Sequence, residues 1–185
     1  MPTLKILDVS TTIGCNLSCK GCNHFSNYFA PTSRLDTDAL IKDIETILPR
    51  LDIGRVSVIG GEPLLNPRCE EIVNACRSHT NSPVYLYTNG LLLFQNEDWI
   101  RKVLEDPRVF LRISIHLKEV EDIIKKFNHP KVLVTIHHTG QDRWFNSIKK
   151  RDGKVYPYNQ GRIAKSYKAC SCPNTQLFKG KLWKC

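Results

Sequence analysis

Three cysteines near the start of the chain have the spacing of metal ligands. Cys15, Cys19 and Cys22 are separated by three and then two residues, in a stretch that follows an alternating apolar run at residues 4–9. Thiolates this close in sequence can converge on one point in space. Because a tetrahedral zinc ion and a cubane iron–sulfur cluster each need four ligands, this loop leaves one coordination position open. In an enzyme that position binds a substrate or cofactor, whereas a structural site closes it with a fourth protein ligand.

Another group of cysteines lies at the other end of the chain. Cys170, Cys172 and Cys185 surround a short apolar hairpin pattern and are also candidate metal ligands. The two remaining cysteines, Cys69 and Cys76, lie on the apolar stripe of an expected helix, where a free cysteine packs as a small hydrophobic side chain. We therefore predict metal binding by the two outer groups and core packing for the middle pair.

Further polar and glycine-containing motifs follow the expected strands. They are Gly60, Gly61, Glu62 and Pro63, then Thr88 and Asn89, then Ser114 and His116, and finally His137 and His138. Glycines let a ligand approach the backbone closely, while Thr88 and Asn89 would also serve in an ordinary turn. The histidines are candidates for substrate contacts or acid–base groups, although a lone histidine at a strand end is more often structural.

Strands and helices alternate in an order that brings these motifs to one edge of a sheet. Short apolar strands are expected at residues 4–9, 56–59, 84–87, 110–116 and 132–136, with helices of 3.6-residue periodicity between them. This alternation indicates βαβ units and a parallel sheet, and the apolar run 132–134 is typical of a strand covered on both faces. With a sixth strand near Val155, the prediction is an α/β fold, a partial parallel (β/α)5–6 barrel. Ligands of such folds collect beyond the carboxyl ends of the strands.

The chain divides into two predicted parts of different charge. Residues 1–160 form the partial barrel, and residues 161–185 form a small cysteine-containing extension with a hairpin that turns at Lys179 and Gly180. The first 140 residues carry 16 basic and 16 acidic side chains and the last 45 carry 11 and 2, so the net charge of +9 lies at this end. A basic segment often binds an anionic partner, although lysines that solvate a loop-rich end give the same composition.

Composition excludes several classes of protein. There is no run of about 18 apolar residues and the first residues lack signal-peptide character, so we expect a soluble, cytoplasmic protein without membrane contact. Eight cysteines in a chain with long helix and strand patterns favour metal binding over a disulfide framework. The basic end lacks the interleaved aromatic residues of a nucleic-acid platform, so nucleic acid is not the expected partner.

Together, these motifs resemble those of the radical S-adenosylmethionine (SAM) enzymes. A Cys-x3-Cys-x2-Cys loop after the first strand, followed by Gly-Gly-Glu-Pro at residues 60–63 after the second, is similar to that family. The resemblance implies that Cys15, Cys19 and Cys22 hold a [4Fe-4S] cluster, with the amino and carboxylate groups of SAM on its fourth iron. One departure is Gly21, where the family usually has an aromatic residue near the adenine.

The resemblance also implies a set of binding residues and a reaction. The SAM-binding set is Gly60, Gly61, Glu62, Pro63, Thr88, Asn89, Ser114 and His116, with Ser114 assigned to the ribose hydroxyls. Reductive cleavage of SAM would give a 5′-deoxyadenosyl radical, which takes a hydrogen atom from an organic substrate. The implied partners are SAM, a reductant such as a flavodoxin or ferredoxin, and a substrate, either a peptide or an anionic sugar- or nucleotide-type molecule. His137 and His138 would contact that substrate.

The C-terminal cysteines resemble the opening half of the extension called SPASM or, in a shorter form, twitch. Cys170, Cys172 and Cys185 would then hold a second [4Fe-4S] cluster, which accepts an electron or binds substrate. The chain ends before the remaining cysteines of that pattern, which also fits a fragment of a longer protein. A zinc site, or a cysteine pair without metal, is the alternative for this group.

Three alternatives to this function differ in class. A glycyl-radical-enzyme activase would share the cysteine loop without needing the C-terminal cysteines. A radical SAM synthase acting on a deazapurine- or pterin-type substrate would fit a compact barrel and an anionic ligand. A non-enzymatic iron–sulfur or zinc-binding module would need a fourth ligand for the first cysteine group, for which His24 is the candidate.

Overall fold

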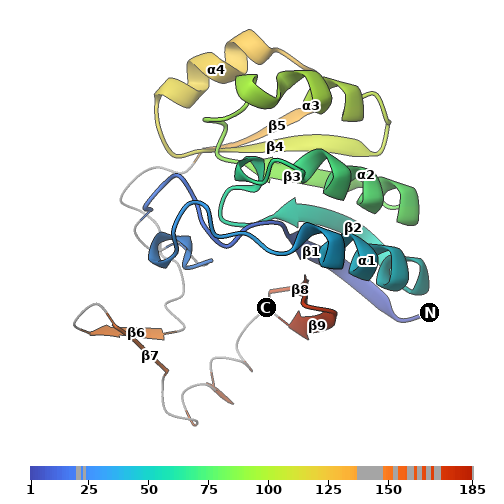
Figure 1. Cartoon of the computed structure of the whole chain (residues 1–185), viewed down its shortest axis with the longest axis vertical. Helices are drawn as coiled ribbons and strands as arrows, with labels where there is room; N and C mark the ends of the chain where they lie inside the picture. The colour runs from blue at the N-terminus through green and yellow to red at the C-terminus, as the bar shows by residue number, and fades with distance from the viewer. Residues whose placement is uncertain are drawn as a thin grey trace.

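In the computed structural model, the chain forms an open sheet with helices packed along one face (Figure 1). The structure describes residues 1–19, 22, 24–136, 148–151, 154–157, 161, 164–165, 168 and 172–184. The helices are α1 (Thr37–Ile47), α2 (Cys69–His79), α3 (Glu97–Val103) and α4 (Glu119–Phe127). The main strands are β1 (Thr3–Ser10), β2 (Asp52–Ile59), β3 (Val84–Thr88), β4 (Val109–Ile115), β5 (Val132–Ile136), β8 (Asn174–Phe178) and β9 (Lys181–Lys184).

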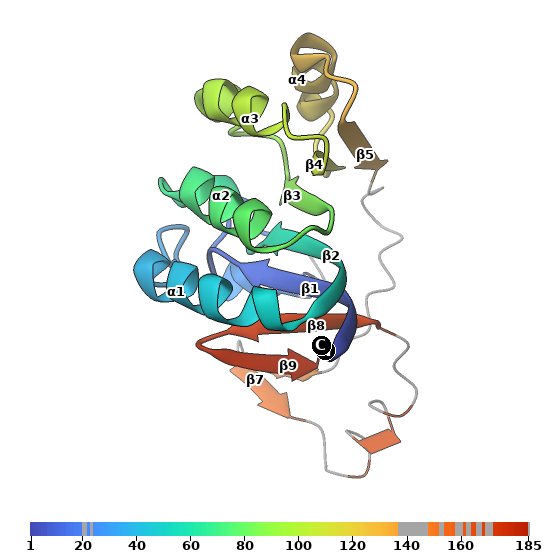
Figure 2. The same cartoon turned by 90° about the vertical axis from the view of Figure 1, so that its right-hand side faces the viewer.

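The sheet confirms the predicted α/β fold and its open, partial-barrel form. Its strand order is β5-β4-β3-β2-β1-β8-β9, and all neighbours are parallel except the pair β8 and β9. Figure 2 shows α1, α2 and α3 in a row on one face of the sheet, with α4 at the β5 end. Among the described residues, no helix is both long and apolar enough to cross a membrane.

The two faces of the sheet differ in character. Toward the helices, the strands present fully buried aliphatic side chains: Leu7, Val9, Val56, Val58, Val84, Leu86, Leu111 and Ile113. Because side chains alternate along a strand, the neighbouring residues face the other way. This second face is largely polar or aromatic and carries Asp8, Ser10, Arg55, Ser57, Tyr85, Tyr87, Arg112 and Ser114. We predicted that residues 132–134 would be covered on both faces of the sheet. This prediction is wrong, because Leu133 and Val134 on the edge strand β5 are 41% and 44% exposed.

Local sequence explains how the first two helices form and pack. Asp36 accepts a hydrogen bond from the backbone N–H of Ala39 at 3.1 Å and so caps the start of α1. Cys69 and Cys76 of α2 are only 1% and 0% exposed, which confirms their predicted place in the core. Burial raises the pKa of Cys76 to about 12, so its thiol stays protonated at neutral pH and is a poor metal ligand.

The C-terminal hairpin joins the sheet beside the first strand. β8 pairs in parallel with β1, with Asn174 opposite Ile6. The amide of Asn174 donates to a carboxylate oxygen of Asp8 at 2.7 Å. The predicted turn is confirmed, because Lys179 and Gly180 have φ values of 50° and 69° between β8 and β9. The division of the chain at residue 160 stays a prediction.

The expected sixth parallel strand near Val155 is wrong. Strand β7 (Lys154–Pro157) contains this residue, but it pairs antiparallel with β6 (Ile148–Arg151) in a separate two-stranded sheet. Strands this close in sequence can pair only antiparallel, since a parallel pair needs a crossover of about a dozen residues or more.

Candidate active site

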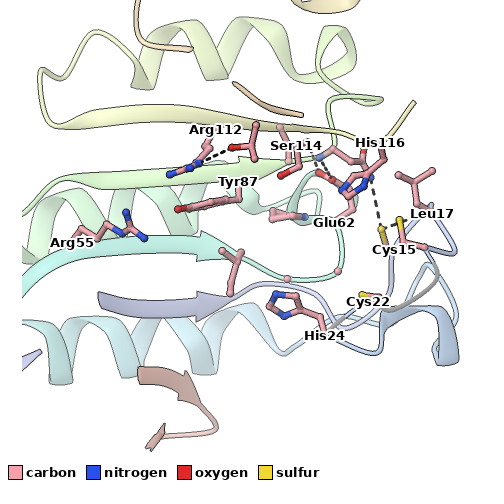
Figure 3. Close-up of a pocket in the computed structure, with 18 residues that line it drawn as sticks. Cys15, Leu17, Cys22, His24, Arg55, Glu62, Tyr87, Arg112, Ser114 and His116 are labelled. Carbon is pink, nitrogen blue, oxygen red and sulfur yellow. Dashed lines mark hydrogen bonds between the residues drawn. The ribbon is translucent and has the colours of Figure 1, made fainter. Parts of the chain in front are cut away.

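A cavity of about 390 Å³ lies at the carboxyl ends of the strands, on the polar face of the sheet (Figure 3). Among its lining residues are all eight of the predicted SAM-binding set: Gly60, Gly61, Glu62, Pro63, Thr88, Asn89, Ser114 and His116. Cys15, Cys19 and Cys22 line the same cavity. The shared direction of the parallel strands thus brings these residues to one cavity, while their functional roles stay a prediction.

The double glycine packs directly against the cysteine loop. A Cβ atom at Gly61 would lie 2.0 Å from the carbonyl oxygen of Gly14, and one at Gly60 would lie 2.4 Å from the hydroxyl of Thr12. The backbone N–H of Gly61 donates to the carbonyl of Thr12 at 3.2 Å, and that of Glu62 donates to the carbonyl of Gly14 at 3.0 Å. The glycines therefore admit protein backbone, and these two amides are already used within the chain.

The side chain of Glu62 connects the loop after β2 to the loop after β3 by hydrogen bonds. Its carboxylate is fully buried and accepts hydrogen bonds from the Thr88 hydroxyl at 2.7 Å and the Asn89 backbone N–H at 2.7 Å. It also accepts the backbone N–H of Leu64 at 3.1 Å. Burial, opposed by these hydrogen bonds, raises the pKa of Glu62 to about 7. The side chains of Glu62 and Thr88 thus bind each other, and the hydrogen bonds of Glu62 connect the two loops.

The hydrogen-bond network continues from Asn89 to Cys15. The side-chain amide of Asn89 donates to the side-chain oxygen of Asn16 at 2.7 Å and lies 3.8 Å from the Cys15 sulfur. The backbone N–H of Leu17 donates to the same sulfur at 3.4 Å. Burial raises the pKa of Cys15 to about 11, so the free thiol keeps its proton at neutral pH. N–H donors directed at the sulfur favour the thiolate once a metal replaces that proton.

The three loop thiols have similar surroundings in the structure. Each is partly buried and borders the cavity, with donors directed at Cys15. Within the described part of the chain, no three His, Cys, Asp or Glu side chains are close enough to hold one metal ion. A [4Fe-4S] cluster binds its thiolates on separate iron atoms, so its ligands need not approach one another as closely as those of a single ion.

The remaining predicted site residues are not among the described residues that line this cavity. His137, His138, Cys170 and Cys185 lie outside the described residues. Cys172 lies just before β8, which runs parallel to β1 with Asn174 opposite Ile6. Since the cysteine loop follows the carboxyl end of β1, Cys172 is toward the opposite end of the sheet.

Sequence reasoning missed several polar residues that line the cavity. Arg55, Tyr87, Arg112 and Thr135 come from β2, β3, β4 and β5, and all border it. The Nε of Arg112 donates to the Thr135 hydroxyl at 3.3 Å. A signal was present in two of these strands, because Arg55 and Ser57 alternate with valines in β2, and Arg112 and Ser114 alternate with aliphatic residues in β4.

A family model of the radical SAM superfamily matches residues 9–149, about three quarters of the chain. The chain belongs to the radical SAM superfamily. This family membership implies an enzyme with a [4Fe-4S] cluster and SAM as cofactors. The alternative of a non-enzymatic zinc or iron–sulfur module is accordingly wrong.

The curated relatives of this radical SAM chain are named GTP 3′,8-cyclase or probable GTP 3′,8-cyclase. A GTP 3′,8-cyclase from Aquifex aeolicus (strain VF5) is 30% identical over 61% of the chain and 35% of its own length. A probable GTP 3′,8-cyclase from Methanocaldococcus jannaschii is 30% identical over 95% of the chain and 55% of its own length. The chain thus spans between about a third and just over half of these relatives.

A solved structure shares the fold. The crystal structure of BtrN in complex with AdoMet and 2-DOIA has a TM-score of 0.55 and 18% identity, over 74% of this chain and 58% of BtrN. At this identity the likeness supports the fold alone.

Proposed function

We propose that the chain holds a [4Fe-4S] cluster through Cys15, Cys19 and Cys22 and cleaves SAM reductively in the cavity beside them. The observation that carries this proposal is that the three thiols border one cavity together with the double-glycine loop and the ends of β3 and β4. When bound, the cluster and SAM supply a 5′-deoxyadenosyl radical that removes a hydrogen atom from a substrate. The protein residues bind, orient and shield the reactants.

The residues near the cluster divide into two roles. Ser114 and His116 border the cavity at the end of β4 and are proposed to contact SAM, with Ser114 at the ribose hydroxyls. Gly60, Gly61 and Pro63 shape the wall on the other side. The hydrogen bonds of Glu62, Thr88 and Asn89 support a positioning role, since these groups hold the loop after β3 against the cysteine loop.

The substrate proposed for testing is an anionic, nucleotide-type molecule. Relatives named GTP 3′,8-cyclases support this class over a peptide. It is also the class expected from the alternative of a pterin-type synthase. The electron is proposed to come from a small reductant protein such as a flavodoxin or ferredoxin. His137 and His138 remain proposed substrate contacts.

A second cluster at Cys170, Cys172 and Cys185 is a separate part of the proposal. The position of Cys172 at the other end of β8 supports a site distinct from the SAM-binding cluster. The two sites can then be emptied independently by substitution.

The test is iron and sulfide content after anaerobic reconstitution, with SAM cleavage assayed under reductant. Cys15/Cys19/Cys22→Ala should lose about four iron atoms per chain and all SAM cleavage. Cys69/Cys76→Ala is the matched control, because it removes thiols that lie in the core, and it should keep both.

Two further variants separate the alternatives. His24→Ala should retain the iron, whereas a zinc site that includes His24 would lose its metal. Cys172→Ala should lose iron only if the second cluster exists, and it should keep substrate-free SAM cleavage. Wild-type protein that binds zinc alone, with no iron, would contradict the proposed function.

A further inference from the structure

Two arginines line the cavity on the polar face of the sheet. Arg55 lies in β2 with its guanidinium 5.6 Å from the centre of the Tyr85 ring, and Arg112 lies in β4 at the same distance from Tyr87. Figure 3 shows both guanidiniums at the end of the cavity away from Cys15. Aromatic rings at this distance attract a cation and orient a planar guanidinium.

Neither guanidinium forms a close ion pair with an acidic side chain of the described residues. In the described part of the chain, no carboxylate forms an ion pair within 4.0 Å of either arginine. The Nε of Arg55 is buried and has no hydrogen-bond partner among the described residues, and Arg112 uses its Nε on Thr135. Two positive charges therefore share one partly buried cavity.

The acidic side chains near this cavity accept hydrogen bonds from groups other than the two arginines. Glu62 is the one described carboxylate that lines it, and both of its oxygens accept backbone N–H groups. Asp8 faces the same side from β1, and burial raises its pKa above the usual value although the charge of Arg55 opposes this. Its carboxylate accepts the amide of Asn174 at 2.7 Å. Among the described side chains at the arginine end of the cavity, the charge left unpaired is therefore positive.

We propose that Arg55 and Arg112 bind the phosphate of an organic phosphate substrate. Desolvating two uncompensated cations costs free energy, which a bound anion offsets. Two guanidinium groups match the double negative charge of a phosphate, and their planar N–H donors suit its oxygens better than a single carboxylate would. This inference rests on the proposed function, since it names the group that the substrate presents.

The strand register sets the orientation of that substrate. Arg55 lies four residues before the end of β2, which is about 13 Å along the strand from Ile59. Arg112 lies opposite Tyr87, nearer the carboxyl end. A phosphate held there leaves the carbon skeleton directed toward Ser114 and the cysteine loop, where the radical is proposed to form.

The experiment measures ligand binding to the reconstituted full chain by anaerobic calorimetry. The probes are GTP, inorganic triphosphate, uncharged guanosine, and succinate as a carboxylate dianion. Arg55→Gln and Arg112→Gln should each weaken GTP and triphosphate binding roughly 10- to 100-fold, the loss of one or two charge-assisted hydrogen bonds. Arg50→Gln removes the same charge from an exposed position and should change affinity less than about twofold.

The outcomes distinguish this inference from the proposed function. Equal phosphate affinity in wild type and both variants, guanosine binding as tightly as GTP, or a preference for succinate would overturn the phosphate site. Substrate-free SAM cleavage is assayed separately in the wild type, where its absence would contradict the proposed function while leaving arginine-dependent phosphate binding intact. If a glutamine variant does not fold, Arg55→Lys and Arg112→Lys keep the charge and should still weaken binding, because they lose the planar fork.

Discussion

Replacing Glu62 with glutamine tests whether one buried carboxyl group holds the loops of the site together. Each of its oxygens accepts a backbone N–H, from Leu64 at 3.1 Å on one and from Asn89 at 2.7 Å on the other. Glutamine has one oxygen and one NH2 group, so either orientation turns an NH2 group against one of these donors. A buried donor left unsatisfied costs about 1–3 kcal/mol. Glu62→Gln should therefore be destabilised by this amount at pH 5, where the wild-type carboxyl is protonated and can still accept.

The effect of this substitution should depend on pH. Burial raises the pKa of Glu62 to about 7, against 4.5 when the group is exposed. The native state consequently binds the proton more tightly than the unfolded state, and the wild type loses stability as the pH rises from the lower value through the higher one. Between pH 5 and pH 8 that loss is about 2.5 kcal/mol, at about 1.4 kcal/mol per pKa unit. Glutamine does not titrate, so the variant does not undergo this loss of stability.

The measurement is urea unfolding of the full chain under thiol reductant, for wild type and Glu62→Gln at pH 5 and pH 8. The stability advantage of the wild type should fall by about 2.5 kcal/mol between the two pH values. Glu45→Gln is the matched control, because it removes a carboxylate from an exposed position on α1. A wild-type advantage that is constant, or that grows toward pH 8, would refute the reasoning.

Three further substitutions probe the loops and the hairpin. Gly61→Ala places a Cβ against the backbone of the cysteine loop and should lower the free energy of unfolding by about 1–3 kcal/mol, measured in urea. Asn174→Ala removes the donor to Asp8, whose pKa burial already raises, so the loss of stability should be larger at pH 7 than at pH 4. Asp43→Ala removes the acceptor of the Gly180 N–H at 2.7 Å, so hydrogen exchange at Gly180 should become faster while exchange in β3 is unchanged.

Much of the fold could be predicted because its signals are local. Alternating strand and helix periods gave β1 to β5, and the parallel direction of these strands brought Ser114 and the double glycine to the edge that carries Cys15. The pairing of β8 with β1 could not be predicted, since register between segments far apart in sequence depends on the packed structure and not on either segment alone. The same limit explains the error at Val155, where a strand was expected correctly but its partner was not.

The site residues that follow the strands were predicted from the sequence, whereas the site residues within the strands were missed. Residues that follow strands stand out in a sequence because glycine, proline and cysteine interrupt the apolar pattern. Arg55, Tyr87 and Arg112 lie within strands, where a polar residue is usually a solvent-facing position of a half-buried sheet. Their collection around one cavity follows from curvature and register, which the sequence does not display.

The parallel pairing of β8 with β1 has a consequence for biosynthesis. The side chains of Asp8 and Asn174, which meet across this pair, are 166 residues apart. While the ribosome is still making the intervening chain, the outer edge of β1 has no neighbour and presents unsatisfied backbone groups to other nascent strands. Such a contact forms slowly because a long loop must close first. A folding helper that shields this edge until translation reaches the hairpin should raise the yield of native protein, more than one that acts on α3 or α4.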